Sequence, residues 1–232
     1  MIAVLYDWWE AFLFGLLMVL RISAVALVLA VACGLIGASA KLSNSRVARA
    51  LAKAYTVVFR GTPELLLLLL FYFGTAITLT SIAQLFNPDA RFVDMPPFWA
   101  GSIAIGLIVG AYMTETFRGA FQGVDAGQTE AALALGLSRR DVFWHIRVPQ
   151  MWRLALPNFG NHMLSIMKDT ALVSIIGLEE LLSVARIANA SVKQPFTLYM
   201  IAAIVYLGIT TVITITVSHL ERRANRHLRG GR

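Results

Sequence analysis

The sequence predicts an all-α membrane protein with several transmembrane helices. Of its 232 residues, 58% are hydrophobic and only 14% are charged, a composition too apolar for a soluble domain. Five stretches are long and apolar enough to cross a bilayer core, which takes about 20 residues in a helix. Lysine and arginine gather on one side of these stretches. Together these observations indicate one polytopic helical domain.

The five predicted spans are joined by loops that carry most of the polar residues. The spans are residues 12–40, 63–82, 98–117, 154–178 and 195–217. The second opens with Thr62 as N-cap and Pro63 at the first helical position, where its missing N–H costs nothing. The third contains small residues, such as Gly106 and Gly110, that would let another helix approach closely. Residues 177–190 are expected to pack as an ordinary loop, with an outer amphipathic helix as the alternative.

Positive charge determines the expected orientation. The loop between spans one and two, the loop between spans three and four, and the C-terminal tail hold most of the lysine and arginine. The other two loops hold only Arg91, Arg186 and Lys193. Because such loops stay in the cytoplasm, we expect the N-terminus outside and the C-terminus, with a basic tail at 224–232, inside. This orientation requires an odd number of spans and places the polar segment 125–150 in the cytoplasm.

That cytoplasmic segment has the pattern of two short capped helices. Asp125 and Gln128 match a capping box that opens the first helix, and Gly136 suits the left-handed turn that ends it. Ser138 opens the second helix, and Pro149 limits its continuation. An ordinary cytoplasmic loop is the alternative, since capping-box matches are common.

The common catalytic and metal-binding motifs are absent from the sequence. No GxxxxGK[ST] phosphate loop occurs, so the chain itself is not expected to bind or hydrolyse ATP. HExxH, GxSxG and cysteine–histidine clusters are absent too, and Cys33 lies within an apolar stretch. His145 and His162 are expected to be hydrogen-bonded polar residues rather than ligands. We therefore expect no enzyme site, cofactor or metal, and the net charge of +7 reflects the loops rather than nucleic-acid binding.

Several polar side chains lie inside the predicted spans, where a charged group facing lipid costs at least about 2.5 kcal/mol. They are Arg21, Glu115, Asn158, Asn161, Lys168 and Asp169. We expect them to face a water-filled cavity or another subunit. A channel or secondary transporter would use them as an ion path, although five spans without an inverted repeat count against this class. A structural membrane scaffold is a further alternative.

Four ordered stretches resemble the permease subunits of binding-protein-dependent ABC importers, in their polar amino-acid branch. They are FRGTPELL from Phe59, GAYMTETFRGAF from Gly110, EAA from Glu130 followed by Gly136 and IRVP, and KDTALVSIIGLEELL from Lys168. The run KLSNSRVARALAKAYTVVFRGTPELL from Lys41 looks most like the histidine, lysine/arginine/ornithine and octopine group, close to the Q-type subunit. The resemblance covers residues 12–223.

This resemblance implies a type I ABC importer transmembrane domain over 12–223, with five transmembrane helices, in the bacterial inner membrane. Segment 125–150 would be the coupling (EAA) loop, whose helix docks in a groove of the ATPase subunit. Its implied coupling residues are Glu130, Ala131, Ala132, Leu133, Leu135, Gly136, Phe143, Ile146 and Pro149. The implied partners are two copies of an ATPase that holds ATP and magnesium, a periplasmic binding protein, and a sister permease or a second copy of this chain.

The resemblance further implies transport of a polar, cationic amino acid such as arginine, lysine, ornithine or histidine, with opines and neutral polar amino acids as alternatives. A cationic group in a low-dielectric cavity needs a carboxylate partner, and Glu115 and Asp169 are the two intramembrane candidates. Each also has a structural alternative, because Glu115 has Arg118 at i,i+3 spacing and Asp169 adjoins Lys168. The predicted substrate path consists of Tyr112, Glu115, Lys168, Asp169 and Thr170.

Overall fold

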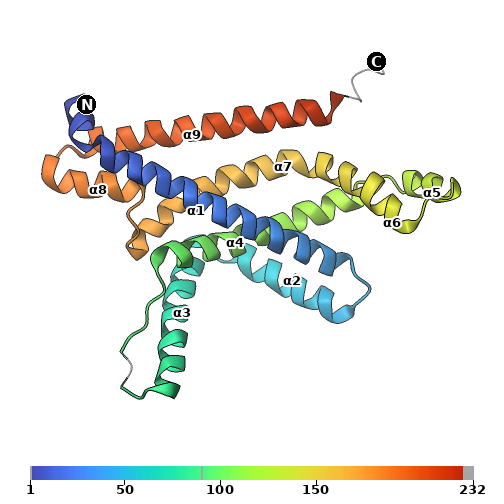
Figure 1. Ribbon diagram of the computed structural model, residues 1–232, viewed down its shortest axis with the longest axis horizontal. Helices are drawn as coiled ribbons and strands as arrows, with labels where there is room; N and C mark the ends of the chain where they lie inside the picture. Colours follow the sequence, from blue (N-terminus) through green and yellow to red (C-terminus); the bar gives the residue numbers. More distant parts are fainter. Residues whose placement is uncertain (1, 90, 227–232) are drawn as a thin grey trace.

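All regular secondary structure in the computed structural model, which describes residues 2–89 and 91–226, is helical (Figure 1). The elements are α1 (Ile2–Leu42), α2 (Arg46–Gly61), α3 (Glu64–Phe86), α4 (Pro97–Gln122), α5 (Ala126–Ala134), α6 (Arg139–Asp141), η1 (Val142–Arg147), α7 (Val148–Asp169), η2 (Thr170–Ile176), α8 (Leu181–Val192) and α9 (Pro195–Ala224). The element η1 is a π-helix and η2 is a 3₁₀-helix. The predicted all-α class is confirmed, while most of the basic tail, residues 227–232, lies outside the described residues.

Four helices of the described chain, α1, α3, α4 and α9, are long and apolar enough to cross a membrane. They contain four of the five predicted spans. The remaining predicted span, 154–178, is divided between α7 and η2. Helix α7 is more polar than the other four because it carries charged side chains such as Arg153 and Lys168 along with asparagine and histidine.

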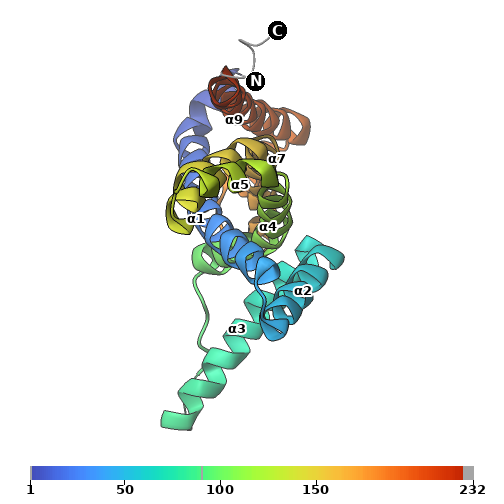
Figure 2. The same ribbon diagram turned by 90° about the vertical axis from the view of Figure 1, so that its right-hand side faces the viewer.

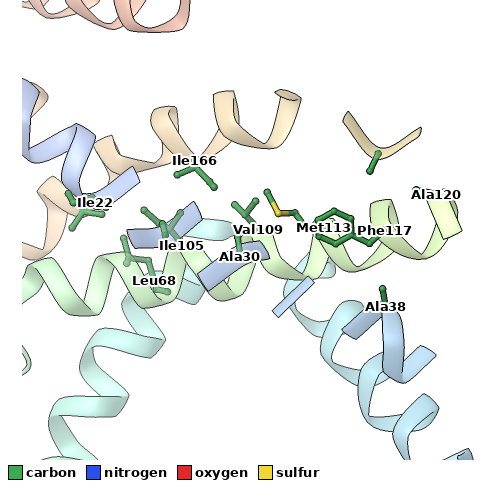
Figure 3. Close-up of a cluster of buried hydrophobic side chains, with 14 of the residues drawn as sticks. Ile22, Ala30, Ala38, Leu68, Ile105, Val109, Met113, Phe117, Ala120 and Ile166 are labelled. Atoms are coloured by element: carbon green, nitrogen blue, oxygen red, sulfur yellow. The ribbon is translucent and has the colours of Figure 1, made fainter. Parts of the chain in front are cut away.

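Helix α4 lies at the centre of the molecule. Most of its residues are buried, and its apolar side chains, including Ile105, Val109 and Phe117, form the middle of the main hydrophobic cluster (Figure 3). Ile22 from α1, Ile166 from α7 and Leu68 from α3 add to this cluster from helices that pack against α4. The polar residues of α7 therefore lie on a helix held by protein on both flanks, since α9 also contacts it.

Helices α1 and α4 run parallel and approach each other closely. A Cβ atom added at Gly106 would lie 2.7 Å from the Cβ of Leu29, and one at Gly110 would lie 2.8 Å from the Cβ of Cys33. Since real Cβ atoms do not come this near, both positions admit only glycine at this separation of the helices. The predicted role of the small residues in span three is thereby confirmed.

Helix α2 occupies the region that the sequence predicted as a loop, and helix α3 corresponds to the predicted span 63–82. Helix α2 is strongly amphipathic and packs Ala52 and Thr56 against α1 and α4. Thr62 ends α2 and Pro63 is the N-cap of α3, so the predicted cap by Thr62 is wrong by one residue and no side chain caps α3. Helix α3 then projects away from the other helices (Figures 1 and 2).

The segment after η2, predicted as a loop with a helix as the alternative, contains a helix. Gly177 has a φ of 92° and ends η2, and Glu180 then caps α8. The carboxylate of Glu180 accepts hydrogen bonds from the N–H of Leu182 and of Ser183, both at 2.9 Å, and from the Tyr206 hydroxyl at 2.8 Å. The first two bonds satisfy N–H groups of the first turn of α8 that would otherwise be unpaired, and the third ties the start of α8 to α9.

Candidate functional site

Segment 125–150 begins as the sequence predicted, with one difference at its cap. Asp125 is the N-cap of α5, and its Oδ1 accepts a hydrogen bond from the N–H of Gly127 at 2.7 Å. Gln128 does not complete a capping box, because its Oε1 accepts a hydrogen bond from Gln150 Nε2 at 3.0 Å. That bond ties the start of α5 to the start of α7 and closes the segment into a compact unit.

Gly136 ends α5 in a left-handed conformation, as predicted. Its φ is 86°, its N–H donates to the carbonyl of Leu133 at 3.0 Å, and the N–H of Leu137 donates to the carbonyl of Ala132 at 3.1 Å. These two bonds are the pair that defines a Schellman motif. A residue with a Cβ atom would be strained here, so the turn depends on glycine.

The second short helix continues directly into α7, so the prediction that Pro149 limits it is wrong. Ser138 caps α6, accepting from the N–H of Asp141 at 3.2 Å. The chain then widens into the π-helix η1, where the N–H of Val148 donates to the carbonyl of Phe143. A π-turn moves the carbonyl that a helical proline would strike, and Pro149 is accommodated in the first turn of α7.

The predicted coupling residues divide into a buried and an exposed set. Ala132 is buried, whereas Leu133 and Leu135 are 41% and 82% exposed, and Glu130, Ala131 and Pro149 are also exposed. Such exposure of leucine in segment 125–150 makes these side chains available to a partner.

Phe143 braces the segment against the membrane helices. Its ring stacks on Phe121 of α4, with centroids 6.1 Å apart. Trp144, which the sequence analysis did not single out, contacts Phe143 edge-on at 5.2 Å and is 57% exposed. Ile146 lines a shallow groove of about 520 Å³ between α5 and η1. Aromatic stacking thus links η1 to the end of α4.

Glu115 lies at the centre of an ion cluster that joins α1, α2 and α4. Its carboxylate pairs directly with Lys41 and accepts from Arg118 Nε at 2.8 Å, while Arg60 Nη1 lies 4.0 Å away. Lys41 also donates to the hydroxyl of Thr56 at 2.6 Å. The structure therefore contains the Glu115–Arg118 pair that the sequence offered as the alternative. Two further cations, Lys41 and Arg60, come from other helices and could not be inferred from spacing within α4.

A second polar group adjoins this cluster and reaches α7. The guanidinium carbon of Arg60 lies 5.4 Å from the ring centroid of Tyr112, a cation–π arrangement. The rings of Tyr112 and His162 are 6.3 Å apart, and His162 Nε2 lies 2.9 Å from the Thr116 hydroxyl. Residues 112, 115 and 116 share one face of α4, so this face of the helix is polar and meets α2 and α7.

The other predicted path residues gather at the end of α7. Asp169 is half-buried beside Glu64 of α3 and Lys168 is exposed. Thr170 is fully buried, and its hydroxyl donates to the carbonyl of Met167 at 2.7 Å. Tyr112 and Glu115 are thus linked through Arg60, whereas Asp169 lies beside Glu64 and Thr170 is buried elsewhere in the fold.

Sequence reasoning did not identify Lys41, Arg60, Thr116 or His162 as members of these clusters. Lys41 and Arg60 lie in the first cytoplasmic loop of the predicted topology. Only the parallel packing of α1 on α4, and the return of α2 along them, brings these residues to Glu115. In the described part of the chain no group of three or more histidine, cysteine or carboxylate side chains is placed to hold a metal ion.

Comparison with known proteins decides the family. Residues 30–226 match the family of binding-protein-dependent transport system inner membrane components. The chain belongs to this family. The HisQ histidine/lysine/arginine/ornithine transport system permease of Escherichia coli K12 is 42% identical over 94% of this chain and 95% of the relative. The OccQ octopine permease of Rhizobium meliloti is 38% identical over 92% and 90%.

Solved structures share the fold of this family member. A crystal structure of an amino acid ABC transporter with histidines has a TM-score of 0.80 and 32% identity, over 94% of this chain and 96% of the other. An inward-facing MetNI methionine transporter has a TM-score of 0.73 at 12% identity, which shows the fold alone.

Family membership gives this chain its place in a transport complex. It is a multi-pass inner membrane permease of a binding-protein-dependent ABC importer, and the ATPase and the binding protein are separate components. The channel, secondary-transporter and scaffold alternatives are set aside by this match. The ion clusters around α4 therefore lie in a permease.

Proposed function

We propose that this chain is the permease subunit of an importer for cationic amino acids. The observation that carries the proposal is the similarity over nearly the full chain to permeases named for histidine, lysine, arginine and ornithine transport. The half-buried carboxyl group of Asp169 beside Glu64 supports it, because two acidic groups on neighbouring helices suit an ammonium or guanidinium ion.

Import of opines is the second candidate, since the octopine permease of Rhizobium meliloti is 38% identical. Uptake into proteoliposomes by the complete complex, with a panel of amino acids and opines, tests both. Concentrative, ATP-dependent uptake of arginine or histidine supports the first proposal. Uptake of opines alone would favour the second, and uptake of neither class would contradict both.

We propose that segment 125–150 is the coupling loop that docks on the ATPase. The exposed side chains of Leu133, Leu135 and Trp144 would enter the groove of the partner. The Schellman turn at Gly136 and the Phe121–Phe143 stack would transmit the motion to α4. ATP and magnesium would be held by the ATPase and not by this chain.

We propose that α7, with η2, forms the fifth span and that the N-terminus is periplasmic. At 1.5 Å per residue, the 22 residues of α7 extend about 33 Å, which matches a bilayer core of about 30 Å. Its polar side chains are tolerable because α4 and α9 flank it. An odd number of spans also satisfies the charge distribution of the loops.

We propose that a second permease subunit, a sister chain or another copy, covers the exposed side of α3. Only Leu68 and Ala76 of this helix are buried, and the helix projects from the rest of the molecule (Figure 2). Similarity to HisQ-type chains favours a sister subunit. Copurification of one tagged and one untagged copy of this chain would show whether the pair is identical.

A further inference from the structure

The ion cluster around Glu115 carries more positive than negative charge. Three cations, Lys41, Arg118 and Arg60, share the single carboxylate of Glu115. Lys41 and Arg118 occupy its two oxygens with direct hydrogen bonds. Two positive charges are therefore in excess, so this cluster would repel the cationic side chain of a ligand and attract a carboxylate group.

Arg60 is the cation that remains free to bind a ligand. It contacts Glu115 only at 4.0 Å, and 43% of its side chain is exposed. Its guanidinium carries five N–H donors, and none of them donates a hydrogen bond to a described residue, whereas Arg118 bonds both Glu115 and Gln122. Arg60 is held in place by the ring of Tyr112, which leaves the N–H edge of the guanidinium open.

The location of Arg60 points to a substrate path. Tyr112 lies within the predicted span 98–117, toward its C-terminal end. The guanidinium stacked on Tyr112 therefore lies inside the span, near that end. An incompletely paired charge at such a depth marks a ligand or ion path. Thr116 and His162, which are hydrogen-bonded to each other beside Tyr112, add polar groups around the same site.

We propose that Arg60 binds the α-carboxylate of the transported amino acid, with Tyr112 as its supporting platform. This inference rests on the proposed function as an amino-acid importer. A guanidinium matches a carboxylate with two parallel hydrogen bonds. Glu115 is then a positioning residue that anchors Lys41 and Arg118 and leaves Arg60 unsaturated. Acidic groups near Asp169 remain available for a cationic side chain.

The decisive experiment measures ligand selectivity in the complete complex in nanodiscs, without the binding protein. Labelled arginine is displaced by arginine, by argininamide, which lacks the carboxylate charge, or by agmatine, which lacks the carboxylate. In the wild type, argininamide and agmatine should compete about 10- to 100-fold more weakly than arginine. In Arg60→Gln, arginine should compete only as weakly as argininamide does. In Arg60→Lys, part of the advantage of arginine over argininamide should return.

Lys53→Gln is the matched control, because Lys53 is an exposed cation on the same helix, and it should keep the wild-type selectivity. A Tyr112→Phe variant retains the ring and should also keep the wild-type selectivity, whereas Tyr112→Leu should reduce the selectivity. Selectivity that persists in Arg60→Gln, or that is absent from the wild type, would overturn the proposal.

A second measurement separates this inference from the proposed function. Uptake per ATP hydrolysed, in proteoliposomes with saturating binding protein, should fall about tenfold in Arg60→Gln, while stimulated ATP hydrolysis and the yield of assembled complex remain. An unchanged ratio would contradict the role of Arg60 even though the wild type imports amino acids. Absence of amino-acid uptake by the wild type would instead refute the proposed function.

Discussion

Single residues in this protein are constrained by backbone conformation and by charge. Gly136 adopts a φ of 86° at the turn between α5 and α6, where a side chain would be strained but would meet no neighbouring atom. Glu115 illustrates the second constraint, because its carboxylate is shared by cations from three helices. The turn at Gly136 lies within the proposed coupling loop, so small changes there should affect how ATP hydrolysis is linked to transport, whereas changes at Glu115 should affect how α1, α2 and α4 are held together.

Replacement of Gly136 should uncouple transport in proportion to the strain in the left-handed region. Gly136→Ala is expected to cost about 1–2 kcal/mol and to lower uptake per ATP hydrolysed, while Gly136→Asn should cost less because asparagine tolerates this conformation. Gly119→Ala is the control, since a Cβ there meets open space within a helix. Equal coupling in Gly136→Ala and Gly119→Ala would count against the role of the turn.

Loss of Lys41 should loosen the packing of the C-terminal end of α1 on α4. Lys41→Gln removes a charge-assisted bond to Glu115, and the Glu115 side chain is only 22% exposed. Losing this bond is expected to lower the stability of the permease by about 1.5–3 kcal/mol. Thermal unfolding of the purified complex should therefore begin at a lower temperature. Lys53→Gln removes an exposed lysine of α2 and should leave the transition unchanged. Similar shifts for both variants would argue against a specific contribution of the ion cluster.

At the scale of elements, close approach and capping determine where the helices lie. Glycine in α4 lets α1 lie parallel to it with near backbone contact, and this pairing brings Lys41 beside Glu115. Glu180 caps α8 with its own carboxylate. The π-helix η1 allows segment 125–150 to run into α7 without a break at Pro149. The sequence contained the glycines and the caps, but neither the parallel partner of α4 nor the π-turn has a distinctive local pattern.

A side chain at Gly110 should force α1 away from α4. Gly110→Ala places a Cβ 2.8 Å from that of Cys33, so overpacking should destabilise the permease by about 1–3 kcal/mol. Gly208→Ala in α9, where the added Cβ meets nothing within 4 Å, should be neutral or slightly stabilising because alanine favours helix. Thermal stability of the two purified variants gives the comparison, and a neutral Gly110→Ala would contradict the close packing.

For the whole molecule, the position of α7 decides the topology. If α7 with η2 crosses the membrane, the loop after α3 and the loop after α8 lie outside, and the coupling segment lies inside. In a Cys33→Ser background, Asp89→Cys and Lys193→Cys should react with a membrane-impermeant maleimide applied from outside. Arg140→Cys should react only after permeabilisation. Labelling of positions 140 and 193 from the same side would show that α7 does not cross.

The sequence by itself determined the helical class, the four most apolar spans, the αL turn at Gly136 and the family resemblance. These features depend on hydrophobicity, on backbone conformation and on short ordered motifs, all of which are local along the chain. The tertiary structure alone decided that α2 packs as a helix on α1 and α4, that Lys41 and Arg60 join the Glu115–Arg118 pair, and that Arg60 rests on Tyr112. Contacts between residues far apart in sequence depend on how helices pack, and the period of a single helix does not encode its partner.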